Sequence, residues 1–174
     1  LLINPTIYPE GVKILEESCD VIYAPDGKPE TMKEYLAQGV NAVILRIEQM
    51  TKELIDSAKD LKVIGANGVG YSNVDVQAAT DAGVCVVNVV GANFYSVAEH
   101  IVMFSLAMAR DVKRADNAVR NGNWQYRDTN PLHDIHGNTF FSVGFGNIGK
   151  EVCRVMSNAF DMNILVYDPY FTKE

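Results

Sequence analysis

The stretch "TFFSVGFGNIGKEVCRV", residues 139–155, decides how the second part of the chain folds. It begins with five residues typical of a β-strand and ends with apolar residues spaced along one face of a helix. The turn between them has the pattern Gly-x-Gly-x-x-Gly. Strand, glycine turn and helix in this order predict a loop that holds a dinucleotide pyrophosphate at the helix N-terminus.

Each glycine of this turn has a separate expected task. Gly144 allows the tight turn, Gly146 lets the backbone approach the pyrophosphate, and Gly149 permits close packing of the helix on the strand. The same pattern also occurs in strand–helix–strand units that bind no ligand, and this alternative stays open.

An acidic residue follows at the spacing that such a unit requires. The run "NILVYD" predicts a second strand that ends at Asp168, nineteen residues after Gly149. A carboxylate there accepts hydrogen bonds from ribose hydroxyls and disfavours a 2′-phosphate. No Arg follows in "PYFTKE". We therefore expect NAD rather than NADP as the cofactor.

The first ninety residues alternate short β-rich runs with helical patterns, which predicts a parallel sheet with helices on both faces. A capping box of Thr31 and Glu34 is expected to open the second helix, and Gly83 to end the fourth. The expected strands are "LLIN", "DVIYA", "NAVILR", "KVIGA" and "VCVVN", and the expected helices span about 9–18, 31–38, 51–59 and 75–82.

A long helix is expected over residues 96–122, opened by a capping box of Ser96 and Glu99. Residues 97–109 are apolar almost all round, which predicts burial on more than one side. A helix that is apolar in its first half and polar in its second suits a position between two domains or two subunits.

A second glycine-rich turn, in "GANGVGYSNVD", places Gly65, Gly68 and Gly70 directly after an expected strand, with Asp75 at the start of the next helix. Backbone N–H groups in such a turn can face an anion such as a carboxylate. An ordinary strand-to-helix turn is the alternative, and spacing alone does not decide between them.

Composition limits the remaining classes. Apolar residues make up 48% and charged residues 21% of the chain, and the net charge of −7, without a Lys and Arg cluster, argues against a nucleic-acid surface. No window is apolar for long enough to span a bilayer. Three distant cysteines indicate neither a disulfide framework nor a metal site, and favour a reducing cytoplasm. We expect Cys85 to be buried and inert.

These motifs, in this order, resemble the D-isomer-specific 2-hydroxyacid dehydrogenases over essentially the whole chain. The similar stretches are "LKVIGANGVGYSNVDVQAATDAGVCVVN", "GANFYSVAEHIVMFSLAMAR", "AVRNGNW" and "VGFGNIGKEV…VYDPY". The resemblance implies an α/β fold: a flavodoxin-like substrate domain at residues 1–93, then an inter-domain helix and the first βαβ part of a Rossmann NAD-binding domain at residues 94–174.

The resemblance also implies site residues. Substrate contacts are expected from the backbone of Val69 and Gly70, which would hold the carboxylate, from Asn93, and from Arg46, for which a surface ion pair is the alternative. Asn147 and Ile148 are expected to offer backbone N–H groups to the pyrophosphate, beside Gly146. Many members carry a basic residue where this chain has Ala66, which implies a less cationic substrate pocket.

The catalytic Arg, Glu and His of the family fall beyond Glu174, so we expect a fragment of a longer enzyme that does not itself transfer hydride. Glu99 and His100 are expected to be structural, because adjacent helix positions point about 100° apart. His133 and His136 are expected to face solvent.

The resemblance further implies a homodimer through the helix starting at Ser96. Two other classes stay open: a non-enzymatic, dimerising NAD-binding module like the corepressors of this family, and a stand-alone flavodoxin-like binding domain.

Overall fold

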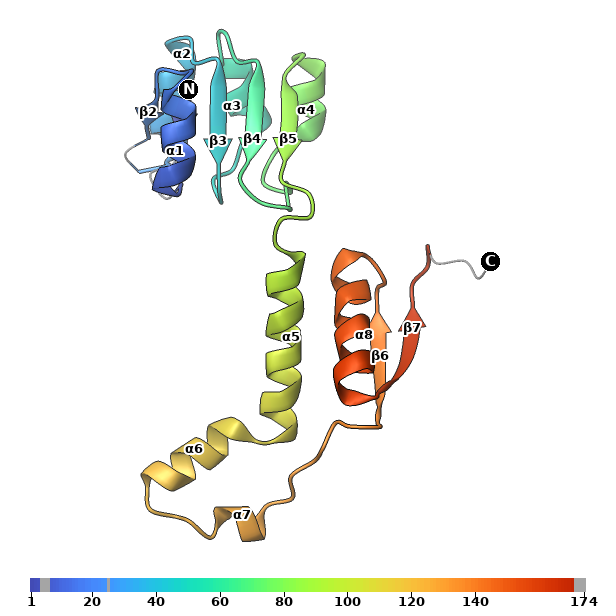
Figure 1. The fold of residues 1–174 in the computed structure, drawn as a ribbon. Coiled ribbons are helices and arrows are strands. Elements are labelled where there is room, and N and C mark those ends of the chain that lie inside the picture. The colour runs from blue at the N-terminus through green and yellow to red at the C-terminus, as the bar shows by residue number, and fades with distance from the viewer. Residues whose placement is uncertain (4–6, 25, 171–174) are drawn as a thin grey trace. The chain divides into compact units, whose positions relative to one another are not determined.

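A computed structural model describes residues 1–3, 7–24 and 26–170 of the chain (Figure 1). The chain forms two compact units, residues 1–90 and 91–174. Asn4, the last residue of the first expected strand, lies outside the described residues. The assignment of residues 1–93 to the substrate and 94–174 to the cofactor stays a prediction.

The first unit is built on a five-stranded parallel sheet in the order β2-β1-β3-β4-β5. All five strands coincide with the expected runs. This is the flavodoxin-like order, in which the chain reverses its direction across the sheet after β2. The strands are β1 (Leu2–Ile3), β2 (Ile22–Tyr23), β3 (Ala42–Leu45), β4 (Val63–Ala66) and β5 (Cys85–Asn88).

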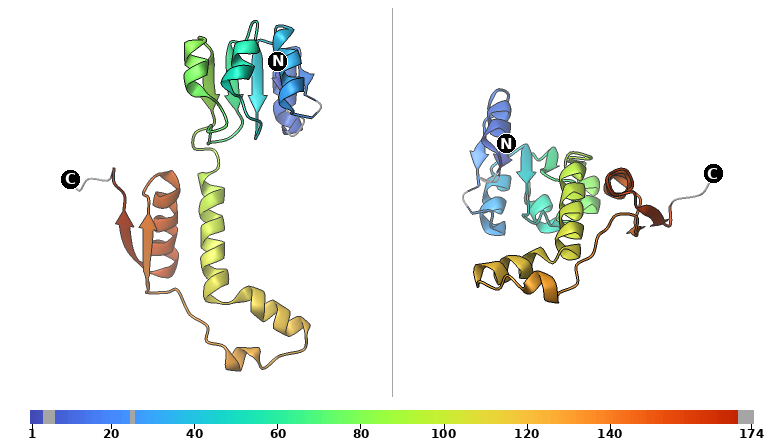
Figure 2. Two further views of the ribbon diagram at one scale, coloured as in Figure 1. Left: turned by 180° about the vertical axis from the view of Figure 1, so that it is seen from behind. Right: turned by 60° about the horizontal axis from the view of Figure 1, so that its bottom comes forward.

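Helices cover both faces of this sheet, as expected. Helix α1 lies on one face, and α2, α3 and α4 lie side by side on the other, which is the near face in the left view of Figure 2. The main core fills the space under those three helices, where Leu36 and Ile64 are fully buried. The helices are α1 (Pro9–Glu16), α2 (Pro29–Ala37), α3 (Lys52–Ser57) and α4 (Val76–Asp81).

Local signals explain where the helices of this unit begin. Asp75 caps α4, because its carboxylate accepts a hydrogen bond from the Ala78 N–H at 2.9 Å. Gly83, with a φ of 69°, follows the end of α4 as expected. The capping box of Thr31 and Glu34 was wrong. Helix α2 begins at Pro29 instead, because the fixed φ of proline suits the first helical position.

The second unit contains one βαβ motif, the expected first part of a Rossmann domain. Strands β6 and β7 are parallel and are joined by α8, and α5 packs beside α8 (Figure 1). Ala98 of α5 and Met156 of α8 are buried in the small core between them. The elements are α5 (Phe94–Ala109), α6 (Val112–Arg120), α7 (Tyr126–Thr129), β6 (Thr139–Val143), α8 (Asn147–Phe160) and β7 (Asn163–Tyr167).

The single long helix expected over residues 96–122 is wrong. Helix α5 begins at Phe94, and the chain breaks at Asp111, whose φ of 48° is left-handed, before α6. The Asp111 carboxylate accepts hydrogen bonds from Arg114 Nε at 2.8 Å and from the Tyr126 hydroxyl. These bonds, first that of Arg114, lower the pKa of Asp111. A short polar side chain tolerates this conformation, and its two partners hold the bend.

Helix α5 buries only one side in this structure, contrary to the expectation for residues 97–109. Its contact with α8 leaves Met103, Phe104 and Met108 with 48%, 53% and 81% of their surface exposed. The apolar character of the helix therefore exceeds what packing within its own unit uses.

All three cysteines are free thiols, and Cys85 is exposed, so its expected burial was wrong. It lies on the edge strand β5 with its side chain on an uncovered part of the sheet. Among the described residues, no helix has the length and apolar character needed to cross a membrane.

The core of the first unit gives a direct test of this architecture. Replacing Ile64, which is fully buried, with Ala is expected to lower the free energy of unfolding by about 2–5 kcal/mol, because it leaves a cavity under the helices. The matched change Ile14→Ala, at a side chain that is 67% exposed on α1, is expected to stay within about 0.5 kcal/mol. Urea unfolding followed by circular dichroism measures both, and equal losses would contradict the assignment of the core.

Candidate cofactor and substrate sites

The glycine turn after β6 is fixed by a contact between two of its own glycines. A Cβ added at Gly149 would lie 2.3 Å from the carbonyl oxygen of Gly144, closer than real Cβ atoms come to backbone. Gly144 itself has a φ of 103°, which other residues rarely adopt. Both positions therefore require glycine for the fold.

Gly146 has no such structural requirement. Its φ of −75° is ordinary, and a Cβ added there would meet nothing within 4 Å. The absence of a side chain instead leaves open space directly beside the first turn of α8. This is the room that a pyrophosphate needs to reach the backbone.

Four successive N–H groups at this position, those of residues 146–149, donate no hydrogen bond to any part of the chain that the structure describes. They belong to the N-terminus of α8, a helix of 14 residues. Such groups carry partial positive charge and point along the helix axis toward an incoming anion. The structure thus brings together Gly144, Gly146, Asn147, Ile148 and Gly149 in one turn.

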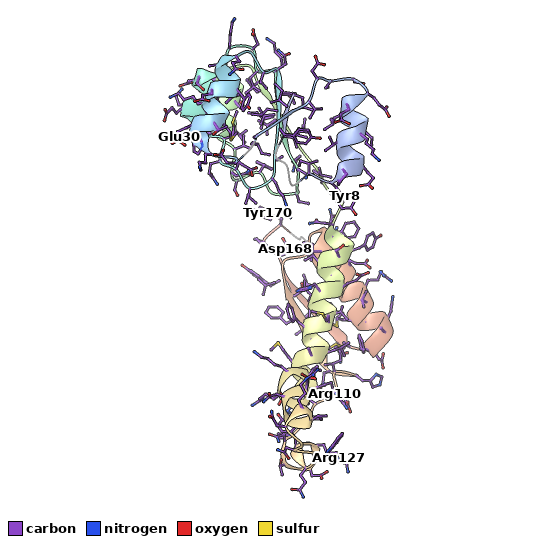
Figure 3. All side chains as sticks on the ribbon, turned by 90° about the vertical axis from the view of Figure 1, so that its left-hand side faces the viewer. Tyr8, Glu30, Arg110, Arg127, Asp168 and Tyr170 are labelled. Atoms are coloured by element: carbon purple, nitrogen blue, oxygen red, sulfur yellow. The ribbon has the colours of Figure 1, made fainter. Side chains whose placement is uncertain are left out.

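Asp168 joins the same turn from the end of β7. Its Oδ2 accepts a hydrogen bond from the Phe145 N–H at 2.7 Å, and its Oδ1 accepts one from the Tyr170 N–H at 2.8 Å. Asp168 therefore lies at the end of the unit where α5 and α8 begin, away from Arg110 at the far end of α5 (Figure 3). These two hydrogen bonds orient the carboxylate at the turn.

Two residues that the sequence analysis did not single out, Ser142 of β6 and Cys153 of α8, lie between the strand and the helix next to the turn. The Ser142 hydroxyl donates to the Gly144 carbonyl at 2.8 Å. Cys153 of α8 is buried next to it, and burial raises the pKa of its thiol, while a hydrogen bond with Ser142 acts in the opposite direction. A small polar and a small apolar side chain here are what the close approach of helix and strand admits.

In the first unit, the loop after β4 is tied to the end of β5 through two consecutive carbonyl groups. The Gly68 carbonyl accepts from the Val89 N–H at 2.9 Å, and the Val69 carbonyl accepts from Asn88 Nδ2 at 2.7 Å. In a trans peptide the C=O of one residue and the N–H of the next point in opposite directions. The N–H groups of Val69 and Gly70 therefore both face away from β5.

This arrangement is suited to hold an anion. In an extended strand, successive carbonyls point to opposite sides, whereas here two in a row point to the same neighbour. The two N–H groups converge in the same way, and neither donates to any described residue. Val69 and Gly70 are exposed. Successive N–H groups on one side of a loop form an anion-binding concavity.

Arg46 lies on the neighbouring loop, directly after β3. The Asn67 N–H donates to the Leu45 carbonyl at 2.7 Å, which places the two loops side by side. The side chain of Arg46 is exposed, and it makes no ion pair with any described residue. Its own N–H donates to the Glu48 carboxylate at 2.8 Å.

Asn93 belongs to the second unit, where it precedes α5 without a side-chain cap. Glu99 and His100 follow on that helix, and the His100 ring stacks edge-on against Phe104 at 4.4 Å. His133 and His136 are exposed, as expected.

Comparison with known proteins identifies the class. Residues 1–174 match the family described as D-isomer specific 2-hydroxyacid dehydrogenase, catalytic domain, and the chain belongs to this family.

The chain spans about a quarter to a half of the length of the curated relatives it matches. It is 36% identical to the D-3-phosphoglycerate dehydrogenase of Methanocaldococcus jannaschii, over 100% of this chain and 33% of that protein. It is 34% identical to the hydroxypyruvate reductase of Thermotoga maritima, over 96% of this chain and 54% of that protein. Among solved structures, it resembles the NAD-dependent formate dehydrogenase of Staphylococcus aureus in complex with NAD, with 28% identity, a TM-score of 0.82, and 98% of this chain and 57% of that one covered.

The two kinds of glycine in the turn predict different outcomes when each is replaced by Ala. Gly149→Ala is expected to lower the free energy of unfolding by about 1–3 kcal/mol, because the new methyl group meets the Gly144 backbone. Gly146→Ala serves as the matched change and is expected to stay within about 1 kcal/mol, because open space surrounds the new group. Urea unfolding measures both, and a Gly149→Ala variant as stable as the parent would contradict the contact.

Proposed function

We propose that this chain supplies the substrate-binding and NAD-binding parts of a dehydrogenase that interconverts a D-2-hydroxy acid and the 2-oxo acid. The observation that carries the proposal is the joined geometry of the second unit, in which the Asp168 carboxylate is hydrogen-bonded to the same turn that presents the N–H groups of α8. A plain glycine turn would not need an acidic group at that position.

The residues fit a dinucleotide. The N–H groups at residues 146–149 would hold the pyrophosphate, with the space beside Gly146 admitting it. The Asp168 carboxylate would accept hydrogen bonds from the ribose hydroxyls and repel a 2′-phosphate, which favours NAD. NAD, when bound, accepts or delivers the hydride. The similar formate dehydrogenase structure contains NAD, which supports this assignment.

The substrate side of the proposal rests on the first unit. The N–H groups of Val69 and Gly70 would bind the carboxylate of the acid, and the exposed guanidinium of Arg46 on the next loop adds positive charge near it. By the family resemblance alone, we also propose Asn93 of the second unit as a substrate contact. The relatives named D-3-phosphoglycerate dehydrogenase and hydroxypyruvate reductase support a small hydroxy or oxo acid as the substrate class.

Proton transfer requires further groups. By the resemblance, these are an Arg that polarises the carbonyl and a His and Glu that move the proton, and none of the residues proposed here for binding takes those roles. The cytoplasm is the proposed location, because three free cysteines, two of them exposed, suit a reducing compartment.

Association as a homodimer is part of the proposal. Helices α5 and α8 border a groove of about 790 Å³. Its lining includes the apolar side chains of Val102, Met103 and Leu106 together with the charged residues Glu99, Arg110, Glu151 and Arg154. The exposed apolar side chains of α5, Met103 among them, make this groove the candidate interaction surface. A second copy presents the same surface around a two-fold axis, so one patch can cover its equivalent.

Cofactor selectivity tests the NAD assignment. NADH is expected to bind residues 1–174 at least about tenfold more tightly than NADPH, because the Asp168 carboxylate opposes the 2′-phosphate. Asp168→Asn is expected to reduce this ratio. The control Asp161→Asn removes the same charge at the other end of α8 and is expected to leave the ratio unchanged. Cofactor fluorescence titration measures all three. Equal affinities for both cofactors, unaffected by Asp168→Asn, would contradict the proposal.

The dimer is tested separately. At tens of micromolar, residues 1–174 are expected to sediment at twice the monomer mass. Met103→Glu is expected to weaken the dimer by at least about tenfold, because it buries a charge in the groove. Ile14→Glu, the same kind of change on exposed α1, is the control and should have no effect. A monomer with intact helical circular dichroism would rule out this interface.

A further inference from the structure

Asn88, the last residue of β5, makes a contact that the fold of the sheet does not require. Its backbone completes the pairing of β5 with β4 opposite Ala66. Its side-chain Nδ2 reaches beyond the sheet and donates to the Val69 carbonyl at 2.7 Å, a length typical of a well-formed hydrogen bond. The amide is therefore directed at the candidate carboxylate loop.

This bond determines the orientation of one peptide plane. The Val69 carbonyl and the Gly70 N–H share that plane, so holding the carbonyl toward Asn88 turns the N–H away from it. The residue after this peptide bond is Gly70, which has the wide conformational range of glycine. No neighbouring atom restrains it, because a Cβ added there would meet nothing within 4 Å. Without the tether, the plane can rotate and the Gly70 N–H loses its fixed direction.

The preceding peptide is oriented independently. The Gly68 carbonyl is held by the Val89 N–H at 2.9 Å, a backbone bond that a substitution at position 88 does not remove. The Val69 N–H therefore keeps its direction whatever residue occupies position 88. Convergence of the two N–H groups therefore needs both bonds, and the Asn88 side chain supplies the one that orients the Gly70 N–H.

We propose that Asn88 is a positioning residue, which turns the Gly70 N–H to the same side as the Val69 N–H and thereby completes the site for the substrate carboxylate. This inference rests on the proposed substrate role of the loop. It assigns to Asn88 no contact with substrate. No sequence pattern singles out this residue, since an Asn at a strand end is ordinary.

The test follows the amide signals of Val69 and Gly70 by ¹H–¹⁵N NMR while glyoxylate, the smallest 2-oxo acid, is added to residues 1–174. Both signals are expected to move together in the parent protein. In Asn88→Ala, and in the similarly sized and uncharged Asn88→Leu, both of which lack the donor, the apparent affinity is expected to fall roughly three- to tenfold, the equivalent of one hydrogen bond. The Gly70 signal should lose most of its response, while that of Val69 keeps part.

Asn41→Ala is the matched control. Its Nδ2 makes the same kind of bond, to the Asp60 carbonyl at 3.2 Å. Asn41 comes just before β3, and therefore lies at the amino ends of the parallel strands, whereas Asn88 lies at their carboxyl ends. The Asn41→Ala variant is expected to bind glyoxylate as the parent does. If both Asn88 variants bind with unchanged affinity and unchanged Gly70 response, the positioning role is wrong and the carboxylate site stands. If the parent signals do not move, the carboxylate site is wrong and this inference falls with it.

Discussion

The approach of Gly149 to the carbonyl oxygen of Gly144 is the contact on which the second unit depends. It sets how closely α8 lies against β6, because no side chain separates the helix from the turn. That closeness puts the first N–H groups of α8 beside the turn. The Gly144 N–H separately donates to the Tyr167 carbonyl at 2.8 Å, which extends the pairing of β6 and β7 as far as Asp168. The steric contact thus positions the proposed pyrophosphate donors, and the strand pairing positions the proposed ribose acceptor.

The two candidate anion sites achieve the same result by different means. In the second unit, N–H groups converge because a helix begins there and its first turn has no internal acceptors. In the first unit no helix begins at residues 69 and 70, and convergence comes from two carbonyls tied to β5. The first kind of site follows from regular structure and is robust. The second depends on individual hydrogen bonds, each contributing only about 1 kcal/mol, and is more sensitive to substitution.

This difference explains how far the sequence allowed prediction. The strands and the glycine turn follow from regular patterns of apolar residues and glycines, so the parallel sheet and the βαβ motif were predictable. The flavodoxin-like arrangement of the sheet came from the family resemblance. The start of α2 was not predictable from its capping pair, because Pro29 begins the helix two residues earlier. The break at Asp111 was not predictable either, because it is held by a hydrogen bond from Tyr126, fifteen residues further along the chain. Asn88 was missed for the same reason, since its partner Val69 is remote in sequence. The burial of Cys85 was predicted wrongly, because the face of β5 that carries its side chain is exposed.

The stability of the glycine turn in the second unit depends on the two strands that flank it. These two strands carry α8 on one face, while cross-strand pairs of large apolar residues, Phe141 with Leu165 and Val143 with Tyr167, lie on the other and are at least half exposed. Parallel sheets are stable when both faces are covered, and two strands alone are marginal. The turn that would bind NAD is therefore held rigidly by its own glycines but rests on a sheet supported from one side. Whatever packs on the bare face stabilises the strands that position Gly144 and Asp168, and so couples packing there to cofactor affinity.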